Sequence, residues 1–371
     1  MRMINGLAYV IVAALIALIS LTRSGHTEEP PAFDHAALAR QALEMHIRPG
    51  YAALVDAGGG LAEELDGFCA RQTAERRRAV DLGFDALVSA WGRIEHIRFG
   101  PVAMGNRLER LFFWPDRRGL GARQVAATLR TRDASVLDAA ALGSKRIALQ
   151  GLGALEAALF GPWPKDPEDR AFRCAYAKAV STNIAAIASE ILREWTEPDL
   201  YVRHWLAPSP GDPYFLKRSE TTLALAKALD NGLERVRDEW IGGALGFGPQ
   251  RRRLTPVLAT SGRTLRFFVA GVEGLHHLYV TAGMSKAIVD TTKAHPDVTV
   301  PLNADLAKRE IETARGELRQ LARQGKRFDP DTMMQPLVAV GFPLKNARLQ
   351  AVALLGLTAG LSMGFNASDG D

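Results

Sequence analysis

The chain has 371 residues, of which 47% are hydrophobic and 23% charged, so extensive disorder is excluded and one large core or two smaller ones can form. Its 46 Lys and Arg residues exceed its 41 Asp and Glu residues, but they are scattered among acids, which argues against a nucleic-acid-binding protein. Aromatic residues make up only 7%, and helix-forming Ala, Leu, Arg and Glu are abundant, so we expect an all-α protein.

The amino terminus has the layout of an export signal. Arg2 is followed by an almost wholly apolar run from Leu7 to Leu21. We expect residues 1–26 to be a signal peptide or an uncleaved N-terminal anchor, in which residues 4–21 would attach the chain to the membrane. In both cases the rest of the chain is expected in the periplasm.

Beyond a short linker, apolar residues at helical spacing predict a succession of helices. These cover about 34–47, 52–98, 122–131, 144–160, 170–196, 219–241, 258–290, 303–324 and 345–364. The densest cluster of helix-breaking residues, APSPGDP at 207–213, lies near the middle of the chain. We therefore expect two helical bundles packed together, a first over 27–206 and a second over 207–371.

Two motifs recur in the same order in both halves. Phe-Gly-Pro occurs at 99–101 and again at 247–249, each time after a predicted helix that carries a Trp. Further along each half, segment 145–159 aligns without gaps on 265–279. This order favours internal duplication, with chance similarity between amphipathic helices as the alternative. Ligand sites are then expected between helices or at the interface of the bundles.

The only two cysteines are Cys69 and Cys174. In an exported protein such a pair is expected to form a disulfide, because the compartment is oxidising. The alternative is a pair of buried, reduced thiols.

Three common catalytic motifs, GxSxG, GxxxxGK[ST] and HExxH, are missing from the sequence, so most familiar enzyme classes lose support. Glu273 and His276 are three residues apart, so on a helix they share a face, as metal-binding Glu and His residues of helical bundles do. If the bundles face each other across a pseudo-twofold axis, Glu156 would join them on one ion, and iron, zinc or manganese would suit these ligands. The alternative is a solvated Glu–His pair on a helix surface.

A second group of candidate residues surrounds the first Phe-Gly-Pro motif. Glu95, His96 and Arg98 are expected to line the cleft and to contact a ligand. Arginines near the loop at 113–116 could bind a carboxylate or phosphate, or could instead pair with Glu95, Glu109 and Asp116 and fix the loop. These arginines are Arg98, Arg107, Arg110, Arg117 and Arg118.

Several stretches together resemble the imelysin family of exported, all-helical bacterial proteins. They are RIEHIRFGP (93–101), FWPDRRGLG (113–121), GLGALEAALFG (151–161), FRCAYAKAVSTNIAAIASEILREW (172–195) and GFNASDGD (364–371). The resemblance implies two duplicated helical bundles, a location in the cell envelope and association with the acquisition of iron or other metals.

The family's GxHxxE motif falls on Gly151, Gly153 and Glu156, so glycine replaces its histidine. Loss of the imidazole argues against a catalytic zinc, which needs three protein ligands and a water. A weaker site that combines Glu156 with groups of the second bundle remains open.

The sequence thus predicts a non-enzymatic envelope protein that binds a metal ion, or a metal-bearing or small anionic ligand, between its bundles and serves metal uptake. Iron and zinc are the candidate metals. One alternative is a metal-dependent peptidase. Another is a scaffold that contacts an envelope protein through the arginine-rich segment 98–123.

Overall fold

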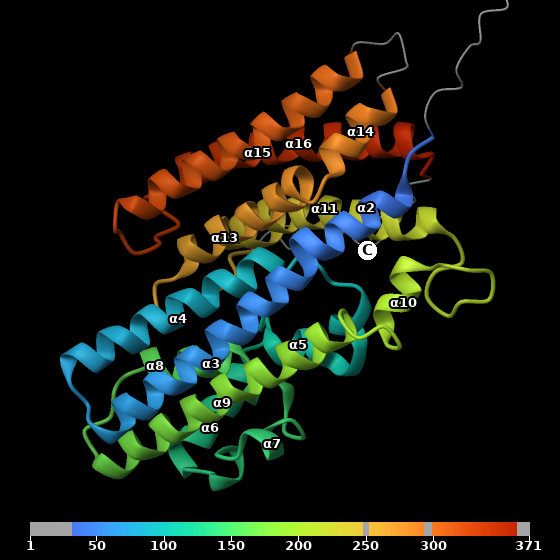
Figure 1. Cartoon of the computed structure of the whole chain (residues 1–371). Helices are drawn as coiled ribbons and strands as arrows, with labels where there is room; N and C mark the ends of the chain where they lie inside the picture. Colours follow the sequence, from blue (N-terminus) through green and yellow to red (C-terminus); the bar gives the residue numbers. More distant parts are fainter. Residues whose placement is uncertain (1–31, 248–251, 293–298, 362–371) are drawn as a thin grey trace, which may run out of the picture.

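The computed structural model describes residues 32–247, 252–292 and 299–361, and every regular element within these ranges is a helix (Figure 1). The prediction of an all-α fold is confirmed. The predicted signal or anchor at 1–26, with its apolar segment 4–21, lies outside the described residues, as does segment 364–371. No helix in the described ranges is both long enough and apolar enough to cross a membrane.

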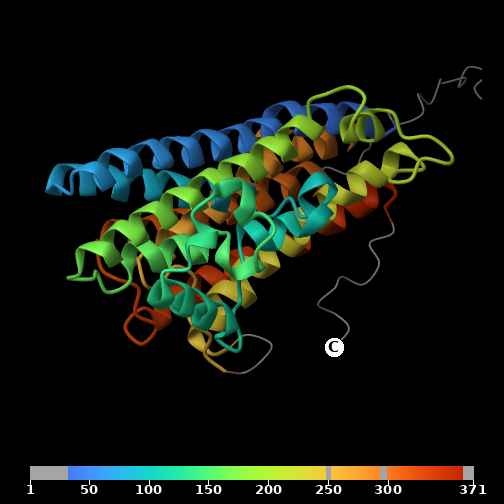
Figure 2. The ribbon, with the colours of Figure 1, turned by 90° about the horizontal axis from the view of Figure 1, so that it is seen from below.

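The first half is built on three long helices. α2 (His35–Ala42) continues through a π-helical turn, η1 (Leu43–Ile47), into α3 (Arg48–Ala70), and α3 packs against α4 (Ala74–Ile94) and α9 (Pro167–Glu194). The chain between α4 and α9 forms short elements, which gather on one face of the molecule (Figure 2). They are η2 (Gly100–Asn106), α5 (Arg107–Leu111), α6 (Leu120–Thr131), η3 (Ala134–Val136), α7 (Ala139–Leu142), η4 (Ile147–Leu149) and α8 (Leu152–Phe160).

The second half follows α10 (Tyr201–Leu206). It comprises α11 (Arg218–Glu234), η5 (Arg235–Gly242), α12 (Gly243–Leu245), α13 (Thr264–His276), η6 (His277–Thr281), α14 (Met284–Thr292), α15 (Thr299–Arg323) and α16 (Met334–Ala359). α15 and α16 pack on each other, and α13 lies between α15 and α4 (Figure 1). The predicted boundary at 207–213 falls in the connection from α10 to α11, and the division into two bundles stays a prediction.

The contact between α4 and α13 joins the two halves. A Cβ atom on Gly274 of α13 would lie 2.0 Å from the carbonyl oxygen of Arg93 on α4, so the two backbones touch at this point. Nearby, the ring of Phe112 from the first half lies 5.3 Å from that of Phe267 on α13, and both are buried. One hydrophobic core therefore includes side chains of both halves.

Several predicted helix boundaries are wrong. The range 144–160 contains the short turn η4, and its α-helix, α8, begins only at Leu152. The range 52–98 is two helices, because the Thr73 hydroxyl accepts a hydrogen bond from the Arg76 amide and begins α4. The range 258–290 is interrupted after η6 at Gly283, whose φ of +91° suits glycine. The last helix begins at Met334, well before 345, because Pro343 is accommodated inside α16.

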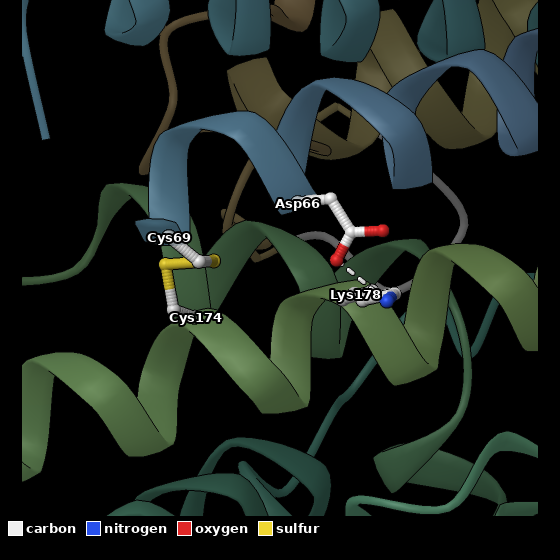
Figure 3. Close-up of a disulfide and its surroundings, with 4 residues drawn as sticks. All are labelled: Asp66, Cys69, Cys174 and Lys178. Carbon is white, nitrogen blue, oxygen red and sulfur yellow. Dashed lines mark ion pairs between the residues drawn. A yellow bond between two sulfur atoms is a disulfide. The ribbon is translucent and has the colours of Figure 1, made fainter. Parts of the chain in front are cut away.

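The predicted disulfide is confirmed. Cys69 near the end of α3 is bonded to Cys174 of α9, with their Cα atoms 5.6 Å apart (Figure 3). On the same two helices, Asp66 pairs with Lys178 at 2.5 Å. Both contacts hold α3 against α9.

Candidate functional site

A pocket of about 340 Å³, which we call the interface pocket, lies between the two halves. One wall is formed by loop 113–119, α6 and α8, and the other by segment 252–260. Gly151, Gly153 and Glu156, the three positions of the GxHxxE pattern, all line it. A concave site at an interface, with apolar walls and a few polar groups, is the usual setting for small-ligand binding.

The two glycines of the pattern shape the pocket in different ways. Gly151 precedes α8, and a Cβ atom there would lie 2.3 Å from the carbonyl oxygen of Leu111, so only glycine lets the chain after α5 pass so closely. Gly153 is exposed on α8, and no atom lies within 4 Å of the position of its missing Cβ. The absence of a side chain at Gly153 therefore leaves open space beside Glu156.

Glu156 is the carboxylate of the interface pocket. Its Oε1 accepts a hydrogen bond from the amide of Ser261 at 2.8 Å, which ties α8 to the second half. Burial raises the pKa of Glu156, and this effect outweighs the hydrogen bonds from Ser261 and the positive charges of Arg263 and Arg327. Because burial destabilises the charged form of Glu156, a neighbouring positive charge would stabilise it, and a carboxylate in such a pocket is a candidate for contact with a bound cation.

Asp116, the other carboxylate of the pocket, has a structural role. Its two oxygens accept hydrogen bonds from the amides of Leu120 at 2.8 Å and Ala122 at 2.9 Å, which fixes the loop at the start of α6. The exposed side chains of Arg117 and Arg252 line the same pocket, and the Arg252 guanidinium donates to the carbonyl of Arg117. The pocket thus combines one available carboxylate with guanidinium groups.

The predicted arginine pairs around this loop form only in part. Arg98 pairs with Glu95, as expected. Arg110 instead donates to the side-chain oxygen of Gln150 at 2.8 Å, and Arg107 pairs with Glu194 at 2.7 Å. Asp116 was expected to fix the loop by pairing with an arginine, but it does so by accepting hydrogen bonds from backbone amides.

Glu273 and His276 face α15. Glu273 accepts hydrogen bonds from Arg93 at 2.9 Å and Arg319 at 2.6 Å, one guanidinium on each carboxylate oxygen. Burial raises the pKa of Glu273, but the hydrogen bonds from Arg319 and Arg93 outweigh it and lower the pKa overall. His276 lies 3.2 Å from Glu312, and burial lowers its pKa.

The structure does not bring together Glu156, Glu273 and His276 as one metal site. Glu156 accepts a hydrogen bond from Ser261, whereas Glu273 contacts arginines of α4 and α15 and His276 contacts Glu312 of α15. The i, i+3 spacing does place the latter two side by side, but arginines occupy the position where a cation was expected. Across the described ranges, no three or more His, Cys, Asp and Glu residues are grouped so that they could hold a metal ion.

Three histidines form a hydrogen-bonded chain between the halves. Nε2 of His46 lies 2.9 Å from Nε2 of His96, and Nδ1 of His46 lies 3.0 Å from Nδ1 of His277. His46 and His277 lie in the π-helical turns η1 and η6, a form often found at functional sites, and His96 follows α4. Because the two nitrogens of His46 point to different partners, the chain is linear and does not converge on one ion.

The neighbours of His96 are charged. Glu95 is 3% exposed and pairs with Arg98 and, at 3.7 Å, with Arg235 of η5. Burial raises the pKa of Glu95, yet the two guanidinium groups lower it overall. Of the three predicted ligand-binding residues, Glu95 and Arg98 thus form a charge cluster with Arg235, and His96 joins the histidine chain.

The sequence did not reveal His46, His277, Arg235 or Ser261. The histidines lie in separate helices with no motif spacing between them, and only the fold brings them together. Ser261 acts through its backbone amide, which leaves no signature in the sequence. The one available signal was the pair His276–His277, of which His276 contacts Glu312 on α15 and His277 contacts His46.

The chain is similar to known proteins in sequence pattern and in fold. A family model described as Imelysin matches residues 47–339, whereas no curated protein matches significantly. An imelysin-like protein from Psychrobacter arcticum 273-4 has a similar structure, with a TM-score of 0.72 at 18% identity over 90% of this chain and 100% of the other. A protein from Parabacteroides distasonis ATCC 8503, named "putative iron-regulated protein A precursor", gives 0.67 at 13% identity over 88% and 96%.

Proposed function

Since this chain belongs to the imelysin family, we propose that it is a non-enzymatic envelope protein that binds a metal-bearing, anionic ligand in the interface pocket and serves metal acquisition. The observation that carries the proposal is the composition of the pocket, in which the half-buried Glu156 faces open space left by Gly153 and guanidinium groups line the wall. The neighbour named an iron-regulated protein precursor supports both iron as the metal and export from the cytoplasm.

The chemistry of the pocket favours a chelate over a bare ion. Glu156 is one carboxylate, and Asp116 already accepts two backbone hydrogen bonds. A bare zinc ion needs three or four protein ligands, so a ligand that brings most of its own metal-binding oxygens fits better. Chelators of this kind are anionic, which suits Arg117 and Arg252.

The two alternatives receive less support. A metal-dependent peptidase needs a complete ligand set, and Gly153 supplies none. The scaffold hypothesis relies on the exposed arginines of segment 98–123, but the loop that carries Arg117 also forms a wall of the pocket. We therefore assign this loop to ligand binding.

Replacing the pocket carboxylate is expected to weaken binding. Glu156→Gln keeps the size and the hydrogen-bond acceptor for Ser261 but removes the charge, so the affinity for ferric citrate should fall about tenfold, as for the loss of one charged contact. Isothermal titration of the chain from residue 27 onward with ferric citrate, and with zinc chloride as the bare-ion comparison, measures the effect.

Glu63→Gln is the matched control, because Glu63 is exposed on α3 and does not line the pocket. Equal ferric citrate binding by both variants would contradict the proposed site. Cleavage of a peptide library that stops when a chelator is added would instead support the peptidase alternative.

Restoring the family's histidine is expected to create a metal site. Gly153→His places an imidazole in open space, three residues before Glu156 and on the same face of α8, so folding should be preserved. We expect zinc affinity at least tenfold above that of the unmodified chain, measured by titration against a zinc indicator. The gain should disappear in the double variant Gly153→His/Glu156→Gln, and its persistence there would show that the zinc binds elsewhere.

A further inference from the structure

A second hollow, which we call the basic groove, is lined by residues of α4, α13 and α15 and of the segments that adjoin them. It encloses about 550 Å³ and shares no lining residue with the interface pocket. Its charged lining consists of two acidic residues, Asp85 and Glu273, and six cationic ones, Arg93, Arg263, Arg266, Arg319, Arg323 and Lys326. Four positive charges are therefore left uncompensated among the lining residues.

The two acids hold four of the arginines in fixed positions. Each oxygen of Glu273 accepts from one guanidinium, Arg93 on α4 and Arg319 on α15. Asp85 pairs in the same way with Arg263 at 2.8 Å and Arg266 at 2.9 Å. The two acids already hold these four arginine side chains in place. The arginines therefore lose little conformational entropy when an anion binds.

The cations also remain accessible to a ligand. The side chains of Arg93, Arg266 and Arg319 are 56%, 48% and 42% exposed although each is paired. At the end of the groove, Arg323 and Lys326 are exposed and have no ion-pair partner among the described residues. A groove with one sign of charge concentrates oppositely charged ligands.

We propose that the basic groove binds a multivalent, phosphate-bearing anion. Phosphate oxygens match the planar donor fork of arginine, and a ligand with more than one negative charge can contact both the paired arginines and the free cations at the end of the groove. This site is additional to the interface pocket and does not depend on its function. A soluble phosphate compound and the headgroup of an anionic phospholipid share the required chemistry.

The direct test is titration of the chain with inorganic pyrophosphate and with inorganic phosphate at low ionic strength. We expect pyrophosphate to bind more tightly than phosphate, with an affinity that falls steeply as salt is added. The variant Arg323→Glu/Lys326→Glu should reduce pyrophosphate affinity at least tenfold. Lys165→Glu/Lys227→Glu makes the same change in net charge at exposed positions outside the groove and should have little effect.

A second variant predicts a change in the opposite direction. Glu273→Gln removes the charge that neutralises Arg93 and Arg319, while its amide oxygen can still accept a hydrogen bond from one of them. We expect the gain in positive charge to exceed the loss of fixed positions, so pyrophosphate affinity should rise several-fold. Vesicles that contain phosphatidylglycerol distinguish the sources, since binding to them but not to pyrophosphate assigns the groove to a lipid headgroup. The proposal is overturned if neither probe binds, or if the groove variant and the charge-matched control weaken binding equally.

Discussion

Lowering the pH from about 7 to about 4.5 is expected to reduce the free energy of unfolding by about 2–3 kcal/mol through His96 alone. His96 is 4% exposed, and burial lowers its pKa from 6.5 to about 4, despite the opposing charge of Glu95. Between these two values the unfolded chain binds a proton that the folded chain excludes. Stability is therefore full above pH 6.5 and declines as the pH falls toward 4.

The geometry of the histidine chain explains why the proton is excluded. A neutral imidazole has one N–H, so the chain can run in one direction, with His96 donating to His46 and His46 donating to His277. An added proton on His96 would then occupy Nδ1, which is buried and has no hydrogen-bond partner. The cost of burying that unpaired charge is the loss of stability that we expect.

Urea unfolding at both pH values measures the effect. In His96→Asn the stability at neutral pH should fall, but the difference between the two pH values should shrink by about 2–3 kcal/mol, because the titrating group is gone. His35→Gln is the control, since His35 is half-buried, contacts Thr222 and lies outside the chain of histidines. An unchanged pH difference in His96→Asn would contradict this account.

Position 156 shows what could be predicted from the sequence. Gly153 and Glu156 are three residues apart on one helix, and Gly151 directly precedes it, so local spacing is enough to place them together in the pocket. The same helical spacing correctly predicted that Glu273 and His276 lie side by side, but it could not predict which side chains they contact. That depends on Arg93 and Arg319, which are 180 and 46 residues away from Glu273 in the chain.

The partners missed by sequence reasoning have a common physical reason. His46 and His96 are 50 residues apart, and His46 and His277 are 231 apart, so only the packing of η1 beside η6 and the end of α4 joins them. Long helices were predicted from periodicity, whereas their ends were missed where a single side chain, such as Thr73, caps the next helix. The cysteine pair was predictable because no third cysteine competes for it.

Removal of the disulfide is expected to have the largest effect on stability. The bond between Cys69 and Cys174 joins residues separated by 105 positions, and closing a loop of that length stabilises a fold by up to about 5 kcal/mol in the chain-entropy model. We expect Cys69→Ala/Cys174→Ala to lower the free energy of unfolding by about 2–5 kcal/mol. Urea unfolding of the unmodified chain with and without a reductant gives an independent value for the same loss.

If the disulfide stabilises the fold through loop closure, its removal should also change how the unfolding free energy depends on urea. If the cross-link acts on the unfolded chain, its removal lets that chain expand, so the dependence of unfolding free energy on urea concentration should become steeper. Asp66→Asn is the control on the same two helices, because it breaks the exposed pair with Lys178 without opening the loop and should cost less than about 1 kcal/mol. Equal losses in the control and in the cysteine variant would mean that local contact between α3 and α9, and not loop closure, carries the stabilisation.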